Sequence, residues 1–277
     1  MNSRQHVYLV ALCLFTASAC GGGKEAKQPT DSFETLADAR LDETVTDTVV
    51  PDGLAADGAD SVVEPPPDNL LQYVEPMIGT GGISYRIGNA FVGAALPFGL
   101  AKLGPDTKDP INGEPTFFHC EGYFYPDTHV SGFSHMHIHG TGAPDYGSLL
   151  VVPGYGMDET KVTESGYMLP LDHDLETNEP GYYKLTLGDP GILAELTSTL
   201  RVGVHRYTFP ETEEAVIIVD PSHVISSCEV QNTDINIDIE AGTVEGMLFT
   251  GCSLSGRFGG FPVFFSGQFR STPVDGS

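Results

Sequence analysis

Three histidines stand at alternate positions in one short run of this sequence. His135, His137 and His139 lie within VSGFSHMHIHGTGAPDYGSLLVVP, which spans Val130 to Pro153. Alternate side chains of an extended chain point to the same face, so we expect the three imidazoles to line one surface. Such a row can ligate a zinc ion in a hydrolase, form hydrogen bonds within a polar cleft wall, or contact a sugar. Further zinc ligands would come from Asp145, His119, His129 and Glu121.

A second candidate is the aromatic segment TFFHCEGYFY, which runs from Thr116 to Tyr125. Its aromatic residues, which include Phe117, Phe118, Tyr123 and Tyr125, stand on both sides of His119 and Glu121 in the sequence. Aromatic faces stack on the apolar faces of sugar rings while nearby polar groups bind hydroxyls, so the segment suits a carbohydrate site. Aromatic packing in the core explains the same pattern, and the chain contains no tryptophan, the strongest sugar platform.

Glycosidase chemistry requires two carboxyl groups across the scissile bond, about 5 to 9.5 Å apart. The available carboxylates near these segments are Asp106, Glu121, Asp127 and Asp145. Their spacing along the chain does not select a pair. Asp145 precedes Tyr146 and Gly147, a sequence typical of a turn.

The elements that would hold these residues are predicted to be strands. From Tyr73 onward, short apolar or alternating runs are separated by glycine and proline, and no window has a helical period. Strands are predicted at 90–103, 147–152, 181–187, 192–200, 203–209, 215–220, 230–239, 243–250 and 261–269. This pattern predicts an all-β fold, a large antiparallel β-sandwich (supersandwich) over residues 73–277.

The first twenty residues have the layout of an export signal. Arg4 and His6 precede an apolar run from Val7 to Phe15, which is too short to span a bilayer. Small residues then lead into Cys20, as in a bacterial lipoprotein signal. We expect lipidation at Cys20 and a place in the bacterial cell envelope, in the periplasm or at the outer membrane, with plain secretion as the alternative. Membrane contact would occur only through the lipid anchor.

Residues 21–72 are predicted to form a disordered acidic linker. They contain twelve acidic residues against Lys24, Lys27 and Arg40, few aromatic residues and a run of three prolines. A segment of this composition cannot bury enough apolar surface to offset the entropy of ordering. The whole chain has a formal net charge of −25 and no basic stripe, which argues against a nucleic-acid partner.

Export would place the cysteines in an oxidising compartment. Without Cys13 and the lipidated Cys20, three cysteines remain, so at most one bridge forms within the chain. We predict a disulfide between Cys228 and Cys252, because they flank a hairpin-like excursion.

Four blocks of the sequence, in order and with conserved spacing, resemble the amino-terminal domain of glycoside hydrolase family 92. They are Tyr73–Gly82 (YVEPMIGTGG), Ala95–Asp106 (ALPFGLAKLGPD), Gly132–Pro153 and Gly181–Pro210. The resemblance implies calcium-dependent, inverting exo-α-mannosidase relatives in which a β-sandwich packs on an (α/α)6 barrel. It also implies that the general acid, the base and most calcium ligands belong to the barrel, so that this sandwich is a truncated member without catalytic residues or a metal site of its own.

The resemblance assigns a wall of the sugar pocket, or the interface with the barrel, to residues of these blocks. The residues predicted to contact substrate or the domain interface are Phe118, His119, Glu121, Tyr123, His135, His137, Thr141, Asp145 and Tyr146. The motif positions carried over also include Gly79, Thr80, Gly81, Asp106, Cys120, Gly122, Gly140 and Gly142. This sequence departs from the family in having Phe118 in place of a common tryptophan, CEGYF in place of CSGYH, and His139 in place of a serine.

We therefore expect the carbohydrate-binding half of an exported exo-α-mannosidase-like hydrolase, whose partners are mannose-containing glycans and a catalytic barrel. The alternative is a stand-alone, surface-tethered carbohydrate-binding module without catalysis. A zinc-dependent hydrolase built on the histidine row is a third hypothesis.

Overall fold

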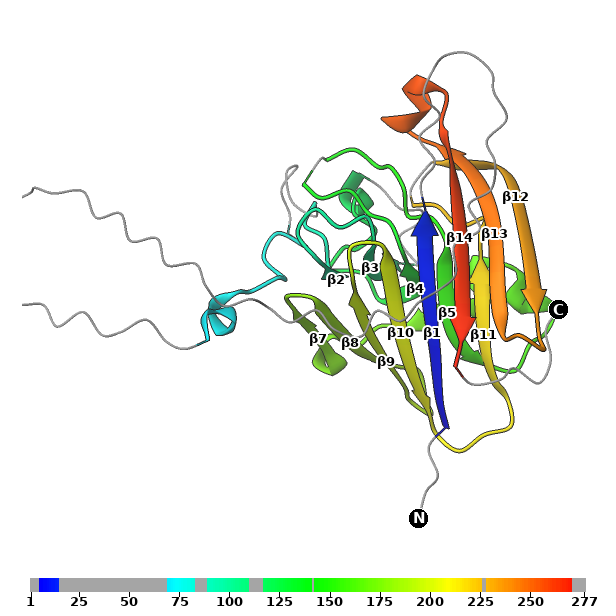
Figure 1. The fold of residues 1–277 in the computed structure, drawn as a ribbon. Helices are drawn as coiled ribbons and strands as arrows, with labels where there is room; N and C mark the ends of the chain where they lie inside the picture. Colours follow the sequence, from blue (N-terminus) through cyan, green and yellow to red (C-terminus); the bar gives the residue numbers. More distant parts are fainter. Residues whose placement is uncertain are drawn as a thin grey trace, which may run out of the picture. The chain divides into compact units, whose positions relative to one another are not determined.

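A computed structural model of the chain describes residues 5–14, 69–82, 89–109, 117–140, 142–225 and 228–270. Within this part, two antiparallel sheets form a sandwich, which confirms the predicted all-β class (Figure 1). The first sheet has the spatial order β12 (Glu229–Asp238), β13 (Thr243–Gly251), β14 (Phe261–Phe269), β1 (Gln5–Leu14), β10 (Val202–Phe209), β9 (Ile192–Ser198), β8 (Tyr182–Leu187) and β7 (Glu176–Glu179). The second has the order β11 (Ala215–Asp220), β5 (Leu150–Tyr155), β4 (His129–Ser134), β3 (Lys102–Lys108) and β2 (Ala94–Ala95), with β6 (Leu169–Pro170) paired to β4.

The core lies between the sheets because the strands alternate apolar and polar residues. In β8 the buried side chains are Tyr183, Leu185 and Leu187, and the intervening residues are partly exposed. From the second sheet, Leu103 and Phe133 join the same buried cluster. Each fully buried side chain of this size contributes about 1.5 to 3 kcal/mol relative to an exposed one. The two-residue period of the sequence is thus the main determinant of the sandwich.

Two of the predicted strand boundaries are wrong. The strand expected at 90–103 is divided into β2 and the first two residues of β3, because a turn closed by Gly99 N–H and Leu96 C=O lies between them and Phe98 in it has a φ of 60°. The strand expected at 147–152 begins only at Leu150, because Tyr146, Gly147 and Leu149 have positive φ angles. Left-handed backbone at these residues ends an extended run.

The helical elements in the described part of the chain are all single turns. They are η1 (Leu70–Tyr73), η2 (Phe117–His119), η3 (Glu159–Val162), α1 (Glu164–Tyr167), η4 (His173–Leu175) and η5 (Ser255–Phe258). None of these described helices has the length and apolar character needed to cross a bilayer. The η1 turn overlaps the end of the predicted linker. The rest of that linker and the lipidation position Cys20 lie outside the described residues.

The apolar segment of the predicted export signal is paired in the first sheet. Gln5–Leu14 forms β1, with β10 on one side and β14 on the other. Removal of residues 1–20 during export stays a prediction, and its consequence for the sheet is considered below.

The two cysteines paired from the sequence, Cys228 and Cys252, are joined by a disulfide. The bond links the start of β12 to the end of β13. Cys120 is buried and lies outside any disulfide. Burial, with the nearby charge of Glu121, raises the pKa of the Cys120 thiol to about 11, so this thiol is protonated and unreactive at neutral pH.

Candidate functional site

The histidine row does not continue a strand, so the extended geometry on which the expectation of one shared surface depends is absent here. β4 ends at Ser134, one residue before the row begins. His135 and His137 are buried, whereas His139 is exposed and accepts a hydrogen bond from the backbone N–H of Phe91. The three imidazoles therefore occupy different environments and have different partners.

His137 binds Asp106, a buried carboxylate of β3. The Nε2 atom of His137 lies 2.9 Å from Asp106 Oδ1, and His223 Nε2 lies 2.7 Å from Oδ2 of the same carboxylate. The register of β3 and β4 shifts between Asp106 and Thr107, and a bulge of this kind redirects side chains. We call Asp106, His137 and His223 the Asp106 centre.

Charge stabilises the Asp106 centre. Burial alone would raise the pKa of Asp106, but the two imidazoles outweigh burial and hold that pKa well below its usual range. Burial would lower the pKa of His223, yet the hydrogen bond and charge of Asp106 raise it. The Nδ1 atom of His137 faces the carbonyl oxygen of Lys102 at 2.7 Å, and its Nε2 faces a carboxylate. The hydroxyl oxygen of Ser134 also lies 2.9 Å from Nε2 of His137.

His135 belongs to a neutral chain of hydrogen bonds that joins the two sheets. Its Nδ1 lies 2.8 Å from the carbonyl oxygen of Leu149, and its Nε2 lies 2.9 Å from Nε2 of His205. His205 in turn binds the hydroxyl of Tyr207 at 2.7 Å. Burial lowers the pKa of His135 to about 4 and that of His205 well below its ordinary value. The chain fits one set of tautomers, in which Tyr207 donates to His205, His205 donates to His135, and His135 donates to Leu149.

The aromatic segment packs against β3. The Nε2 atom of His119 lies 2.7 Å from Asp127 Oδ2, which also accepts from the hydroxyl of Thr107. Phe118 stacks on Phe124 with ring centroids 5.0 Å apart. This segment includes Glu121, which is buried.

Gly122 allows the aromatic segment to approach the Asp106 centre. Its φ is 84°, and a Cβ at this position would lie 2.0 Å from Asp106 Oδ1 and 3.0 Å from His137 Nε2. Only glycine fits such a position. The structure thereby brings the aromatic segment and the histidine row together, with Asp106 between them.

A second carboxylate, Glu176 at the start of β7, organises the other end of the aromatic segment. Its two oxygens accept from the hydroxyls of Tyr123 and Tyr183 at 2.9 and 2.7 Å, and Oε2 lies 2.8 Å from Nδ1 of His173. Nε2 of His173 lies 2.7 Å from the carbonyl oxygen of Tyr125. The ring of Tyr125 stacks on His173, with centroids 4.0 Å and planes 12° apart. We call these two rings the Tyr125–His173 stack.

The Tyr125–His173 stack is accessible to solvent. Tyr125 is 45% exposed and the side chain of His173 is 26% exposed, whereas the Glu176 side chain beneath them is 3% exposed. A flat aromatic surface backed by a fixed carboxylate suits the apolar face of a sugar ring, with donors and acceptors at its rim. Sequence analysis included Tyr125 in its aromatic segment but missed His173 and Glu176, which lie about fifty residues downstream in a run without a motif.

Asp145 has a local bonding role in the structure. Its Oδ2 accepts from the backbone N–H groups of Leu254 and Ser255 at 2.8 and 2.7 Å, and its Oδ1 accepts from the Ser255 hydroxyl at 2.6 Å. The carboxylate therefore fastens the η5 turn, next to the disulfide. Tyr146 follows with a φ of 72°, forms an isolated bridge with His137 and packs edge-on against Phe261.

The predicted site residues thus form several adjacent networks. His137 and Tyr146 meet at the bridge beside the Asp106 centre, and the aromatic segment reaches the same centre through Gly122. His135 binds His205 in the hydrogen-bonded chain between the sheets, and Asp145 accepts from the η5 turn. Thr141, also predicted as a site residue, lies outside the described residues. The partners that sequence reasoning missed are His223, His205, His173 and Glu176.

The residues that were considered as zinc ligands are engaged in other contacts. Both ring nitrogens of His135 and of His137 have protein partners, so neither imidazole is available to an ion. Among the described residues, no group of three His, Cys, Asp or Glu side chains has the arrangement of a metal site. The imidazoles of His135 and His137, as the structure places them, therefore do not fit a zinc site.

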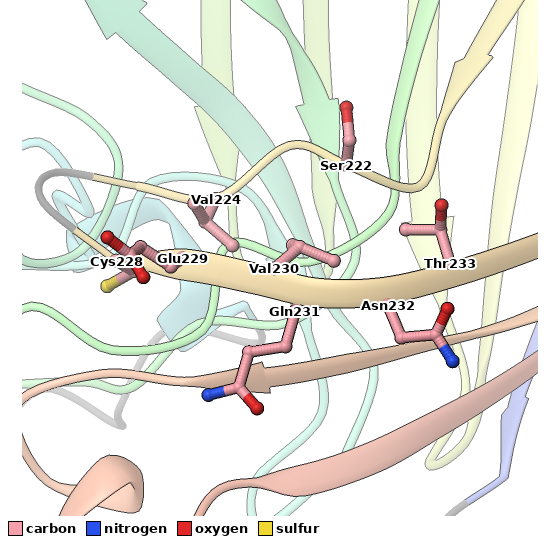
Figure 2. A pocket seen from close by; sticks show the side chains of 8 residues that line it. All are labelled: Ser222, Val224, Cys228, Glu229, Val230, Gln231, Asn232 and Thr233. Carbon is pink, nitrogen blue, oxygen red and sulfur yellow. The ribbon is translucent and has the colours of Figure 1, made fainter.

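A surface hollow of about 540 Å³ lies beside β12 (Figure 2). It is lined by Ser222, Val224, Cys228, Glu229, Val230, Gln231, Asn232 and Thr233. Figure 2 shows that these side chains come from β12 and from the segment that precedes it. None of the predicted site residues contributes to this hollow.

The chain is thus an antiparallel β-sandwich whose loops contain aromatic, histidine and carboxylate networks. The family description "Glycosyl hydrolase family 92 N-terminal domain" matches residues 73–277. The chain belongs to this family.

Relatives agree with the assignment. A protein of Arthroderma benhamiae, named as an uncharacterized secreted glycosidase, is 31% identical over 214 residues, which are 73% of this chain and 25% of the relative. A family GH92 α-mannosidase of Bacteroides thetaiotaomicron, solved with mannoimidazole, is 26% identical with a TM-score of 0.57 over 72% of this chain and 32% of its own. An inverting GH92 mannosidase from the same organism shares the fold at 20% identity, with a TM-score of 0.53 over 74% of this chain and 30% of its own. The chain thus spans a third or less of these relatives.

Proposed function

We propose that this chain forms the substrate-facing, non-catalytic wall of an exported exo-α-mannosidase-like glycoside hydrolase. The catalytic carboxyl groups would lie on further polypeptide, in a barrel domain. The observation that carries the proposal is the solvent-accessible Tyr125–His173 stack, in a chain that belongs to the family 92 amino-terminal domains. Mannose-containing glycans are the proposed ligands, in agreement with the mannosidase relatives.

The buried carboxylates support a non-catalytic role. Asp106 and Asp145 are each bonded to two or more protein groups, and so are Asp127 and Glu176. A general acid or base must reach the substrate and exchange a proton with it, directly or through water. These four groups are instead committed to holding loops and strands together.

Calcium and export complete the proposal. Calcium would be bound by the further polypeptide, since the described residues offer no suitable cluster of ligands. Export would follow the leader of residues 1–20, with lipidation at Cys20, and the secreted fungal relative is in keeping with export. The proposed location is the cell envelope.

Titration calorimetry with methyl α-mannoside tests the proposed wall. We expect weak, millimolar binding to the exported chain, loss of that binding in Tyr125→Ala, and retention in Phe258→Ala, which removes a ring that is 89% exposed on η5. Absence of binding to the unmodified chain, or equal binding by both variants, would overturn the assignment of the stack.

A hydrolysis assay tests the absence of catalytic groups. We expect no cleavage of an aryl α-mannoside by the chain alone, with calcium present. Turnover that is lost in Glu121→Gln or Asp145→Asn would show that the catalytic carboxylates belong to this chain.

The second candidate is a stand-alone, surface-tethered carbohydrate-binding module. It is favoured by the exposure of the stack within this chain. For a binding module, we expect polymeric mannan to retard the chain in affinity electrophoresis. For a partial pocket wall, which binds a mannoside only weakly, we expect no retardation.

A further inference from the structure

The first sheet is continuous only through β1. One edge of β1 pairs with β10, from Leu12 opposite Val202 to Gln5 opposite Phe209. Its other edge pairs with β14. Figure 1 shows β1 between these two strands, in the middle of the sheet. Without β1 the sheet divides into β12-β13-β14 and β10-β9-β8-β7, with an open slot between β10 and β14.

The slot lies over the core. On β10 the side chains of His205 and Tyr207 are buried, and on β14 those of Val263 and Phe265 are buried. Backbone N–H and C=O groups along an open slot lose their partners, and each such buried group costs about 1 to 3 kcal/mol if it stays unsatisfied. The fold therefore requires a strand at this position.

The neighbouring strands define the sequence that fits the slot. Residues directly opposite each other in an antiparallel pair share a face. Along the slot, His205 and Phe265 belong to the buried face. The outward face contains the exposed polar residues Arg206, Ser266 and Gln268, and also Phe264, which is 39% exposed. A matched strand has small or apolar residues opposite the buried positions and polar residues between them.

The sequence of β1 does not follow that rule. Tyr8 is opposite the exposed Arg206, and Leu12 is opposite the exposed Ser266. From Val7 onward QHVYLVALCL is apolar at every position. An uninterrupted apolar run is typical of an export leader, whereas strands with one solvated face alternate. The β1 segment thus has the length for the slot but not the alternation that the slot selects.

We propose that the slot between β10 and β14 is a strand-acceptor site, occupied after export by a strand of the polypeptide that carries the remaining length of the family. The donor is an extended segment of eight to ten residues with alternating apolar and polar side chains, antiparallel to both neighbours. The source of this strand rests on the proposed function, because the solved relative extends well beyond the 32% of its length that this chain covers. The slot itself is inferred from the strand pairing alone and does not depend on the proposed function.

The test uses the exported 277-residue chain, without the further polypeptide that would supply the donor strand. Mass spectrometry first determines its N-terminus, and amide hydrogen exchange then measures protection along β10 and β14. The probe is a synthetic peptide of residues 5–14 that carries Tyr8→Thr, Val10→Thr, Leu12→Cys and Cys13→Ala. Its outward positions 8 and 10 are then polar, position 12 has a thiol, and Leu14 stays opposite Phe264. A peptide that also carries Leu9→Asp, opposite the buried His205, is the negative control.

Disulfide trapping locates the bound peptide. Ser266→Cys places a thiol opposite peptide position 12, and Asn236→Cys places one on exposed β12 at the far edge of the sheet. We expect a processed chain whose β10 and β14 amides exchange about tenfold more slowly with the matched peptide, and disulfide formation at Ser266→Cys only.

Three results would overturn the proposal: an exported chain that retains residues 5–14 in the sheet, a processed chain whose β10 and β14 amides are protected without peptide, or a matched peptide that gives neither protection nor trapping. Failure of the proposed function has a different readout, because loss of mannoside binding leaves trapping at Ser266→Cys unchanged.

Discussion

The Nε2 atom of His223 lies 2.7 Å from Oδ2 of Asp106, although 117 residues separate them in the sequence. This contact joins the segment after β11 to β3, and His137 completes the centre from the other side. All three side chains are buried. If one partner is removed, water therefore cannot reach the remaining charged group and take the place of that partner.

Asp106→Asn is expected to lower the free energy of unfolding by about 3 to 5 kcal/mol, because an amide cannot accept from both imidazoles and leaves a buried charge unpaired. Urea denaturation measures the change. Asp234→Asn on exposed β12 is the control and should stay within about 0.5 kcal/mol of the parent. Equal effects at the two positions would contradict a charged centre.

Gly122→Ala is expected to destabilise the chain by at least about 2 kcal/mol more than Gly181→Ala. Both glycines have positive φ angles, 84° and 77°, so both variants carry the same backbone strain. Only at Gly122 does the new Cβ meet Asp106 Oδ1, since nothing lies within 4 Å of a Cβ at Gly181. The two midpoints of urea unfolding give the comparison, and coincident midpoints would show that the approach to Asp106 carries no energetic weight.

Glu176→Gln is expected to cost about 1 to 3 kcal/mol, because one of the two oxygens becomes an N–H₂ group that cannot accept from a phenol or an imidazole. The variant should also change the near-ultraviolet circular dichroism, since Tyr123, Tyr183 and the Tyr125–His173 stack all depend on this carboxylate. Glu179→Gln, exposed on the same strand, is the matched control. An unchanged spectrum in Glu176→Gln would mean that the rings are held by packing alone.

The sequence predicts the sandwich well because alternation is a local property. β8, β9 and β10 each follow a two-residue period, and their bounds were predicted to within two residues. The predicted strand at 147–152 began too early because Tyr146 and Leu149 have positive φ angles. These angles depend on packing around the loop, and in a sequence only glycine signals a positive φ.

The site was harder to predict, because its partners are distant in the chain. The alternate spacing of His135 and His137 made them candidate site residues, but nothing in the sequence indicates that His205 binds the first and that Asp106 binds the second. Glu176 is one of 38 acidic residues, and its three partners come from three places in the fold: Tyr123 from the aromatic segment, Tyr183 from β8 and His173 from η4.

The His135–His205 pair leads to a prediction about acid. Burial lowers the pKa of His135 to about 4 and that of His205 well below its ordinary value, so both rings are neutral in the fold. The unfolded chain binds protons at these histidines below about pH 6.5. Where the unfolded state binds more protons than the folded state, stability decreases as the pH decreases.

The free energy of unfolding should therefore decrease as the pH falls from about 6.5 to about 4, with His135 alone contributing on the order of 3 kcal/mol over that window. His223 has the opposite sign. Its pKa is raised in the fold, so its contribution is complete below about pH 6.5 and is lost as the pH rises through the folded pKa. Stability is expected to be greatest near neutral pH.

Urea unfolding at half-unit pH steps measures this profile, and two variants separate titration from packing. His135→Met/His205→Leu should flatten the acid side, because neither replacement titrates. Tyr207→Phe removes the donor to His205 but keeps both imidazoles, so it should lower stability by about 1 kcal/mol at every pH and leave the acid slope in place. If the double variant kept the full acid slope, the loss of stability would have to come from carboxylates, and the neutral histidine chain between the sheets would have no part in it.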